Sequence, residues 1–382
     1  MRDRIGIGVI GVGGRGTLSL SLKDDPRVEL RGGADISDRY LGEFKDNTRS
    51  DIYTTNDYRE LLKRDDIDAI MVTSPDFCHE EHAVAALQAG KHLFCEKPLA
   101  ISTKGCDRIL TEWKKAGVRM MVGFNMRYMR KFRVIKEIVD SGAIGEIKAV
   151  WCRHFVGRGG EFYYHYWHAT RDKSCSLLLQ KGSHDIDMIH WITGRYTRRV
   201  TAFGSLSFYG GNKDNDLVCD ECPEIDSCTD PLPNDRKNRC AFRKEVDVED
   251  NNMMLMELEG GILASYLQCH FTPDYFRNHL FIGTEGRVEL VNDSLVRVKT
   301  RSSNTWREYS DRDYHIKPAK GGHGGADPVI CVDFVDMLAN GKLPEATPID
   351  GRMSVAAGVA AAQSLRNNGM PVDIPALPGG LE

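Results

Sequence analysis

The first third of the chain alternates short apolar runs with amphipathic stretches. The apolar runs have the length of buried strands and lie at residues 5–10, 28–34, 69–72, 92–95 and 119–122. Two of the stretches between them, 79–89 and 102–116, repeat their apolar positions with a helical period. Gly90 and Gly117 stand where such helices end. Strands and helices in strict alternation predict a parallel, doubly wound sheet.

The pattern changes near residue 147, where longer β-rich segments replace this alternation. They predict a large, mostly antiparallel open sheet with strands at 148–154, 200–208, 251–257, 261–270, 287–291 and 295–299. An apolar strand end at 177–180 is expected to turn into a helix, and further helices are expected at 132–141, 327–340 and 351–367. We therefore predict an α/β protein with a Rossmann domain at 1–124 and an α+β domain at 125–382. The last helix could pack back on the first domain.

The composition is that of an ordinary globular protein. Of 382 residues, 41% are hydrophobic and 28% are charged, and every apolar run is much shorter than the roughly 20 residues that span a bilayer. The net charge of -4 lacks the basic excess of nucleic-acid-binding domains. Eleven cysteines, an odd number and mostly scattered, make a poor disulfide framework. We therefore expect a cytoplasmic protein that binds neither nucleic acid nor a membrane.

A glycine-rich turn directly follows the first predicted strand. Its G-x-G-x-x-G pattern comprises Gly11, Gly13, Gly14, Arg15 and Gly16. Such a turn lets the backbone approach a pyrophosphate, and the N-terminus of the following helix offers N–H groups to the phosphates. Asp35 ends the second predicted strand, where a carboxylate accepts hydrogen bonds from ribose hydroxyls and repels a 2′-phosphate. The motif predicts NAD as cofactor, and Arg39 nearby leaves NADP as the less favoured alternative.

A lysine stands where doubly wound sheets bind their ligands. Glu96, Lys97 and Pro98 follow the predicted strand 92–95, at the carboxyl edge of the sheet. A cationic nicotinamide and partial burial would both lower the pKa of Lys97 at such a position. Lys97 is therefore a candidate proton carrier for a substrate hydroxyl.

A second group of candidates surrounds the predicted turn into the helix after residue 181. His184 lies near this turn, and Asp187 lies one helical turn later on the same face. Gln180 and Lys181 precede His184 at similar reach. These four residues are candidates for a catalytic set in the second domain.

The segment 163–171 is dense in aromatic rings and hydrogen-bond donors. Rings can cover the C–H faces of a sugar while polar groups bind its hydroxyls, so we consider His165, Trp167 and Arg171 as substrate-binding residues. A packed aromatic core would contain the same tyrosines. Both interpretations remain open at this point.

These motifs, spread over nearly the whole chain, resemble the glucose-fructose oxidoreductase, inositol dehydrogenase and rhizopine catabolism (Gfo/Idh/MocA) family. The resemblance rests on the glycine loop, Thr73-Ser74-Pro75 with His79, Glu96-Lys97-Pro98, residues 123–128, the His184 segment and Gly283-Thr284-Glu285-Gly286. It implies NAD(P)-dependent oxidation or reduction of a carbinol carbon in sugars, inositols and related polyols. It also implies cofactor contacts from Ser74, Pro75, His79, Glu96, Lys97 and Asn125, and substrate contacts from Arg127. The loop 321–327 is similar to one that approaches the substrate in relatives, which makes His323 a weaker candidate.

One position departs from the family pattern. Lys97 matches the family's E-K-P lysine and His184 its catalytic histidine, but many members carry an aspartate where this chain has Gln180. Glutamine cannot exchange a proton. Either Lys97 and His184 suffice while Gln180 binds a hydroxyl, or Lys181 or Asp187 takes the missing role.

The resulting hypothesis is hydride transfer to NAD, with His184 taking the hydroxyl proton and Lys97 stabilising the alkoxide. Relatives suggest an alternative, in which transient oxidation serves elimination or hydrolysis of a glycoside. A non-catalytic NAD-binding sensor is a further alternative. Absence of Lys97 or His184 would favour it, but both residues are present. An open sheet with one face to cover also suggests a homo-oligomer, a dimer or a tetramer.

Four cysteines crowd into an insertion of the second domain at about 210–245. Cys219, Cys222, Cys228 and Cys240 lie in a segment with few apolar residues, so something other than a hydrophobic core must order it. A C-x2-C pair with two further thiolates predicts a closed structural metal site. Zinc is favoured, an iron–sulfur cluster is the alternative, and free thiols or two disulfides also remain open.

Overall fold

The computed structural model describes residues 4–234, 239–301, 309–317 and 319–381. The chain forms two compact units. The first takes residues 1–130, 318–355 and 376–382, and the second takes 131–317 and 356–375. The sequence division had placed 318–355 in the second domain. They belong to the first unit because apolar side chains of α9 (Ala326–Asn340) join the core beneath the first sheet.

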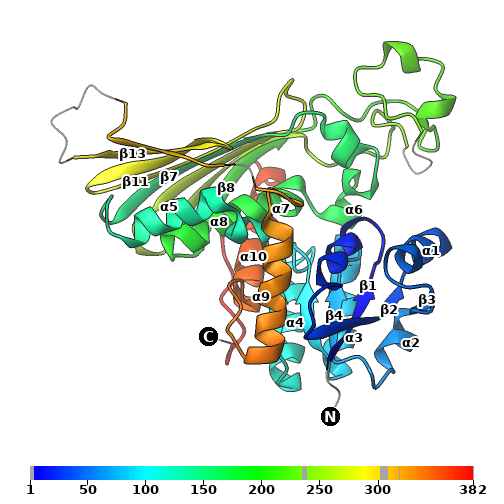
Figure 1. The fold of residues 1–382 in the computed structure, drawn as a ribbon. Coiled ribbons are helices and arrows are strands. Elements are labelled where there is room, and N and C mark those ends of the chain that lie inside the picture. The colour runs from blue at the N-terminus through cyan, green and yellow to red at the C-terminus, as the bar shows by residue number, and fades with distance from the viewer. Residues whose placement is uncertain (1–3, 235–238, 302–308, 318, 382) are drawn as a thin grey trace. The chain divides into compact units, whose positions relative to one another are not determined.

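A six-stranded parallel sheet forms the centre of the first unit (Figure 1). The strand order is β3-β2-β1-β4-β5-β6, so the direction of winding reverses beside β1, where doubly wound sheets bind their ligands. The strands are β1 (Ile5–Ile10), β2 (Val28–Ala34), β3 (Tyr53–Thr55), β4 (Ala69–Val72), β5 (His92–Cys95) and β6 (Met120–Val122). The predicted doubly wound sheet is confirmed.

Helices connect these strands and cover the sheet. α4 (Thr103–Ala116) shows how the sequence sets their ends: the Ser102 side chain accepts a hydrogen bond from the Gly105 N–H, and Gly117 ends the helix at a φ of 64°. Phe94 on β5 is fully buried and meets Phe334 of α9 edge-on, at 5.5 Å between ring centroids. The other helices of this unit are η1 (Gly14–Leu22), α1 (Asp38–Asn47), α2 (Tyr58–Leu62), η2 (Asp76–Cys78), α3 (His79–Gln88) and η3 (Asn125–Tyr128).

A nine-stranded sheet dominates the second unit, and α5 (Arg130–Asp140) and α8 (Gly182–Thr193) lie along one of its faces (Figure 1). The order is β14-β13-β12-β11-β7-β10-β9-β8-β15, antiparallel throughout except where β7 pairs with β10. The strands are β7 (Ile147–Phe155), β8 (Thr197–Ser205), β9 (Asn251–Leu258), β10 (Leu263–Cys269), β11 (Phe276–Gly283), β12 (Gly286–Asn292), β13 (Leu295–Thr300), β14 (Arg312–His315) and β15 (Val372–Asp373). The predicted, mostly antiparallel second sheet is confirmed. α10 (Pro348–Arg366) contributes residues to both units.

The sequence prediction misses β11, although this strand lies near the middle of the sheet. Its inward positions include Arg277 and His279, which are buried and reach Asp185 of α8. The strand therefore lacks the apolar alternation by which a half-buried strand is recognised.

Two other expectations are wrong in detail. Residues 177–180 form a short helix, α7 (Leu177–Gln180), whose first turn is capped by the Ser176 side chain. A fully buried apolar run carries no period that separates strand from helix. β8 ends at Ser205 rather than Phe208, because the Asp250 carboxylate accepts the N–H groups of residues 207–209. None of the described helices has the length and apolar character of a membrane span.

Candidate active site

The glycine loop of the first unit leaves its backbone open at the switch point of the sheet. Gly11 has a φ of 87°, and a Cβ there would lie 2.6 Å from the backbone of Ser74. A Cβ at Gly16 would lie 2.2 Å from the Gly11 carbonyl oxygen, whereas one at Gly14 would meet no atom within 4 Å. The glycines thus allow tight packing beneath the loop and free space above it, as phosphate binding requires.

Asp35 follows β2 directly and faces this loop. Its Oδ2 accepts a hydrogen bond from the Gly13 N–H at 3.2 Å, and its Oδ1 accepts one from the Ser37 N–H at 3.0 Å. The next residue, Ile36, is 93% exposed, which is unusual for a large apolar side chain. Sequence reasoning missed Ile36, although an apolar residue directly after the strand-end acid is visible in the sequence. Arg39 is engaged by Glu43 at 2.7 Å.

A partly buried polar network brings several predicted residues together. Arg15 Nε donates to Glu96 Oε1 at 2.6 Å, and its two Nη atoms donate to the carboxylate of Asp327 at 2.8 and 3.0 Å. Asn125 Nδ2 donates to Asp327 at 3.3 Å, and His323 Nδ1 lies 2.9 Å from the same carboxylate. Residues distant in the sequence therefore share one acid at the carboxyl edge of the first sheet.

The charges in this network support one another. Burial opposes the charge of Arg15, but the negative charges of Glu96 and Asp327 outweigh it and raise the pKa of the guanidinium. Burial likewise tends to raise the pKa of Asp327, but hydrogen bonds from His323 and Arg15 outweigh it and lower that pKa far below its usual value. Sequence reasoning missed Asp327. Its place in the first turn of α9, after a glycine-rich loop, was the available signal.

The ends of β4 and β5 are tied to each other. His79 is buried, and its two ring nitrogens lie 2.8 Å from the Ser74 carbonyl oxygen and 2.7 Å from that of Pro98. Pro75 precedes the short helix η2. Lys97 is partly buried, its backbone N–H donates to Glu96 Oε2 at 3.1 Å, and the Lys97–Pro98 peptide is cis. The loop that carries Lys97 is thus held at the edge where the glycine loop lies.

In the second unit the predicted catalytic set is placed where α7 meets α8. Gln180 ends α7, and His184 and Asp187 lie within the first two turns of α8; all three are buried. Lys181 joins the two helices. A Cβ at Gly182 would lie 3.1 Å from the Tyr266 ring, so this junction packs closely against β10.

Asp185, beside His184, anchors α8 to the sheet. It accepts a hydrogen bond from the Tyr266 hydroxyl at 3.0 Å, and His154 Nδ1 and Arg277 Nε each lie 3.2 Å from its carboxylate. Burial tends to raise the pKa of Asp185, but the charge of Arg277 outweighs it and holds that pKa well below its usual value. This buried ion pair fixes His184 relative to β7, β10 and β11.

Beside this anchor lies a group of polar residues that we call the polar wall: Tyr163, Lys181, His154, Gln268 and His270. Lys181 Nζ lies 5.8 Å from the Tyr163 ring centroid, and no described carboxylate forms an ion pair with it. Burial, followed by the charge of Arg277, lowers the pKa of Lys181 and lowers that of His154 to about 3. Gln268 Nε2 contacts His270 Nε2.

The polar wall carries hydrogen-bonding capacity that the protein does not use. Gln268 Oε1, His270 Nδ1 and His154 Nε2 are buried and have no hydrogen-bond partner among the described residues. Buried polar atoms in proteins are nearly always paired. Such a concentration of unpaired groups with shifted pKa values is typical of a ligand site. The sequence motifs singled out Lys181, and Tyr163 belongs to the aromatic segment 163–171. His154, Gln268 and His270 lie on strands or directly after one, and they join the other two only in the fold.

The remaining substrate candidates have protein partners. Arg127 is buried, donates to the Glu345 carbonyl oxygen and pairs with Asp350 at 3.2 Å. Arg171 pairs with Glu249 at 2.8 Å. His165 Nδ1 and Nε2 lie 2.8 and 3.0 Å from the carbonyl oxygens of Arg239 and Asp230. Trp167 stacks on His168, at 3.7 Å between ring centroids. The observed contacts of the two arginines and of His165 stabilise loops.

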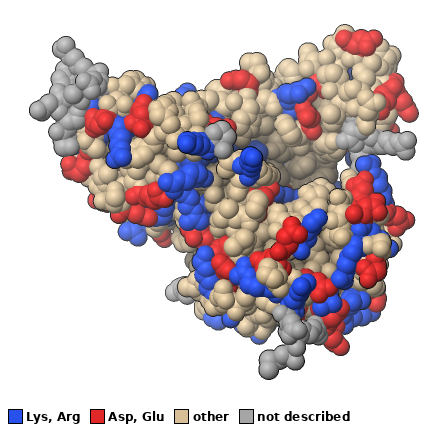
Figure 2. All heavy atoms as spheres, viewed as in Figure 1, with Lys and Arg blue, Asp and Glu red and all other residues tan. Residues whose placement is uncertain are grey.

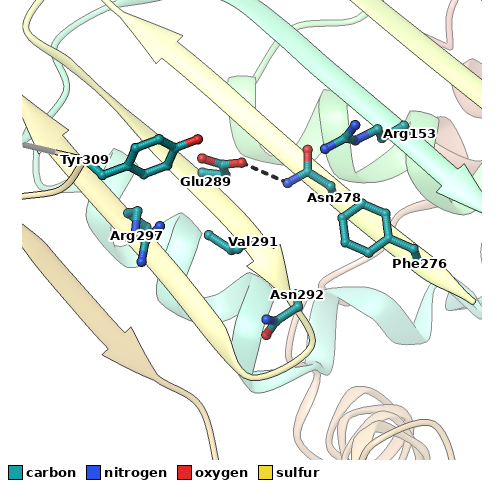
Figure 3. A pocket seen from close by; sticks show the side chains of 8 residues that line it. All are labelled: Arg153, Phe276, Asn278, Glu289, Val291, Asn292, Arg297 and Tyr309. Carbon is teal, nitrogen blue, oxygen red and sulfur yellow. Dashed lines mark hydrogen bonds between the residues drawn. The ribbon is translucent and has the colours of Figure 1, made fainter.

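A pocket of about 470 Å³ lies on the face of the second sheet that is turned away from α8 (Figure 3). Arg153 and Asn278 line it, and Asn278 donates to Glu289 at 3.1 Å. Side chains alternate between the faces of a strand, so these residues point away from His154, Arg277 and α8. This pocket is therefore separate from the polar wall.

Figure 2 shows how charge is distributed on one face of the molecule. Lysine and arginine side chains lie among aspartate and glutamate side chains over much of this face.

Comparisons with known proteins match both parts of the chain. A family profile described as "Oxidoreductase family, NAD-binding Rossmann fold" (GFO_IDH_MocA) matches residues 5–124, and one described as "Oxidoreductase family, C-terminal alpha/beta domain" matches 136–374. The putative oxidoreductase YteT of Bacillus subtilis is 25% identical over 322 residues, which is 74% of this chain and 75% of YteT. Inositol 2-dehydrogenase of Salmonella typhimurium is 32% identical over 167 residues, which is 44% of this chain and only 45% of that enzyme.

Solved structures share the fold over the whole chain. An oxidoreductase domain protein from Kribbella flavida is 23% identical with a TM-score of 0.80, covering 98% of this chain and 100% of that one. Levoglucosan dehydrogenase in complex with NADH and levoglucosan is 21% identical, with the same TM-score and coverage. At these identities the likeness concerns the fold.

Proposed function

Because the chain belongs to the Gfo/Idh/MocA family of NAD-binding oxidoreductases, we propose that it transfers hydride between NAD and a carbinol carbon of a sugar, inositol or related polyol. The observation that carries the proposal is the polar wall. A polyhydroxylated substrate would pair its buried, unpaired groups, and a site built to bind hydroxyls strongly rejects molecules that lack them.

The first unit has the features that NAD requires. The open backbone at Gly14 suits a pyrophosphate, the Asp35 carboxylate suits the adenosine ribose, and the exposed Ile36 offers an apolar surface to adenine. NAD, when bound, supplies the acceptor for the hydride. NADP fits less well, because Asp35 would face its 2′-phosphate.

We assign the proton chemistry to this chain's own residues. His184 accepts the hydroxyl proton, and Lys97 donates a hydrogen bond to the developing alkoxide. Gln180 binds a neighbouring hydroxyl. Lys181, whose pKa is lowered by burial, is able to exchange a proton and takes the role of the aspartate that many relatives carry at the position of Gln180.

Because Gln180 stands where many relatives carry an aspartate, a second reaction is an alternative. Transient oxidation followed by elimination or hydrolysis of a glycoside uses the same residues but returns the hydride to the product. It turns over with NAD and forms no net NADH. A non-catalytic NAD sensor is the weaker alternative, because Lys97 and His184 are both present.

We also infer that two or more copies associate through the outward face of the second sheet. Trp151, Phe203, Met253, Leu255 and Leu263 lie on this face with exposed fractions between 48% and 63%. Phe203 pairs with Met253, and Ser265 lies between Leu255 and Trp151, so these side chains are contiguous across four strands. Light scattering should find a dimer or tetramer, and Leu255→Lys should dissociate it; a monomeric wild-type protein contradicts the inference.

The roles of His184 and Lys97 are tested by single substitutions. His184→Ala and Lys97→Ala should each lower kcat by about 100-fold or more, as expected for loss of a positioned acid–base group. The exposed residues His315 and Lys104 provide matched controls, and His315→Ala and Lys104→Ala should retain wild-type kcat. His184→Ala should still bind NAD in calorimetry. Near-normal turnover of His184→Ala removes this residue from the mechanism.

A further inference from the structure

The insertion of the second unit is ordered without a hydrophobic core of its own. Between Gly211 and Asn234, all of them described, the only buried residue is Cys219. The flanks are tied down: Asp230 Oδ2 accepts hydrogen bonds from the Tyr209 hydroxyl at 2.5 Å and the Gly160 N–H at 3.0 Å. Buried Arg243 donates to the Tyr164 carbonyl oxygen at 2.6 Å. In the stretch from Cys219 to Cys228, Cys219 is buried and Cys222 and Cys228 are half-buried.

The other three cysteines of the insertion lie near enough to Cys219 to interact with it electrostatically. Val218 pairs with Arg239 in an isolated antiparallel bridge, and the Cys240 N–H donates to the Leu217 carbonyl oxygen at 2.7 Å, which sets Cys219 and Cys240 on adjacent segments. The turn η6 (Cys219–Glu221) brings Cys222 back, and its N–H donates to the Cys219 carbonyl oxygen at 3.1 Å. Cys228 follows a second turn, η7 (Ile225–Ser227). All four are free thiols, so no disulfide orders the segment.

A backbone N–H and a lysine lie beside the thiols. The Phe242 N–H donates to Cys240 Sγ at 3.4 Å. Lys213 lies near enough to Cys222 and Cys240 to interact with both electrostatically. Donors and a cation directed at thiolates are what a metal–thiolate centre requires.

Elsewhere in the described part of the chain, Cys152, Asp185 and His279 lie with their ligand atoms within 4.8 Å of one another. Asp185 already contacts Arg277, His154 and Tyr266, so the group of Cys152, Asp185 and His279 belongs to the contacts that anchor α8. The thiols of the insertion are not drawn together within that distance in the described structure. Zn–S bonds of about 2.3 Å require sulfurs about 3.8 Å apart, so the two turns must close on the ion.

We propose that Cys219, Cys222, Cys228 and Cys240 bind one structural zinc ion as a closed tetrahedral set of thiolates. The scarcity of buried residues in the insertion, the bridge that sets Cys219 beside Cys240 and the two turns that precede Cys222 and Cys228 together carry this proposal. Four soft thiolates select zinc over hard cations, and a set without an open position supports a structural role. The ion would replace the missing core and fix the loops that reach His165 and Gly160.

The test uses the full-length protein purified without added metal. Elemental analysis should find about one zinc per chain, and titration of the thiols with a mercurial reagent should release it. Cys222→Ser and Cys228→Ser should each lose most of the zinc. Cys269 is a matched control, because it is partly buried on β10 outside the insertion, and Cys269→Ser should keep the zinc.

A second measurement does not depend on the folding of the variants. Removal of zinc from the wild-type protein by a chelator should make residues 211–234 susceptible to limited proteolysis, and added zinc should restore their protection. A metal-free protein whose four thiols titrate at once overturns the proposal. So do iron and inorganic sulfide in place of zinc, or equal zinc content in Cys222→Ser and the wild type.

Discussion

Replacement of Asp35 by serine tests how the chain selects its dinucleotide. The Asp35 carboxylate lies at the end of β2, within 3.2 Å of the Gly13 N–H, and its neighbour Arg39 is engaged by Glu43. With NAD bound, the carboxylate should accept hydrogen bonds from the ribose hydroxyls. With NADP bound, it would face a 2′-phosphate. Asp35→Ser removes both the attraction and the repulsion while keeping a short oxygen-bearing side chain.

The two effects have different sizes. Hydrogen bonds to a charged group contribute about 1.5 to 3 kcal/mol each, and serine retains part of this, so NAD should bind about 2 kcal/mol more weakly, roughly 30-fold. A phosphate about 5 Å from the carboxylate, at an effective dielectric constant of about 40, is repelled by about 1.7 kcal/mol per charge. The ratio of the Kd for NADP to the Kd for NAD should therefore fall by at least about 100-fold.

Isothermal titration calorimetry with each dinucleotide measures both values. Asp38→Ser is the matched control, because it removes the same charge from an exposed position three residues later and should leave the ratio unchanged. Tighter binding of NADP than NAD by the wild-type protein would refute the assignment of Asp35. An unchanged ratio in Asp35→Ser would do the same.

Three further variants probe the two units. Gln180→Asp introduces the carboxylate that many family members carry and should retain or raise NADH formation. Loss of NADH formation in this variant would indicate a reaction that needs the Gln180 amide. Lys181→Met should lower kcat yet raise the free energy of unfolding by about 1 kcal/mol at neutral pH. The pKa of Lys181 is lowered in the folded state, so the unfolded chain binds more protons at this residue. The free energy of unfolding of the wild-type protein should therefore rise with pH above neutrality. Urea unfolding should show a smaller rise in Lys181→Met. Asp327→Asn should lower the free energy of unfolding, measured from the urea midpoint, by about 2 kcal/mol. In this variant Arg15 retains Glu96 as its only carboxylate partner among the described residues. Because the pKa of Asp327 is lowered, this deficit should shrink as the pH falls from about 5 to about 3, and a constant deficit contradicts the network.

Periodicity was a sufficient guide wherever apolar side chains face the core. β1, β2, β4 and β5 match their predicted ranges, because strands buried in a parallel sheet consist mainly of apolar or small residues. It failed at β11, where Arg277 and His279 point inward to meet Asp185. A buried ion pair between elements far apart in the sequence leaves no local trace in the pattern.

Part of the candidate site could likewise be predicted. Motifs singled out the glycine loop, Asp35, Lys97 and the His184 segment as candidates, since each lies directly at a strand end or a helix start. They did not locate Asp327, Gln268 or His270, which join their clusters only through tertiary contacts. Nor did they show that Arg127 and Arg171 have carboxylate partners in the fold.

The central claim is net oxidation of a polyol by NAD, and the most direct test is NADH formation measured by absorbance. The purified protein is mixed with NAD and a panel of inositols, sugars and glycosides, and products are analysed by mass spectrometry. We expect NADH in equal amount to a product two hydrogens lighter than one of these substrates, with turnover abolished in His184→Ala. Conversion of a glycoside with no NADH formed, or NAD binding without conversion of any member of the panel, would contradict it.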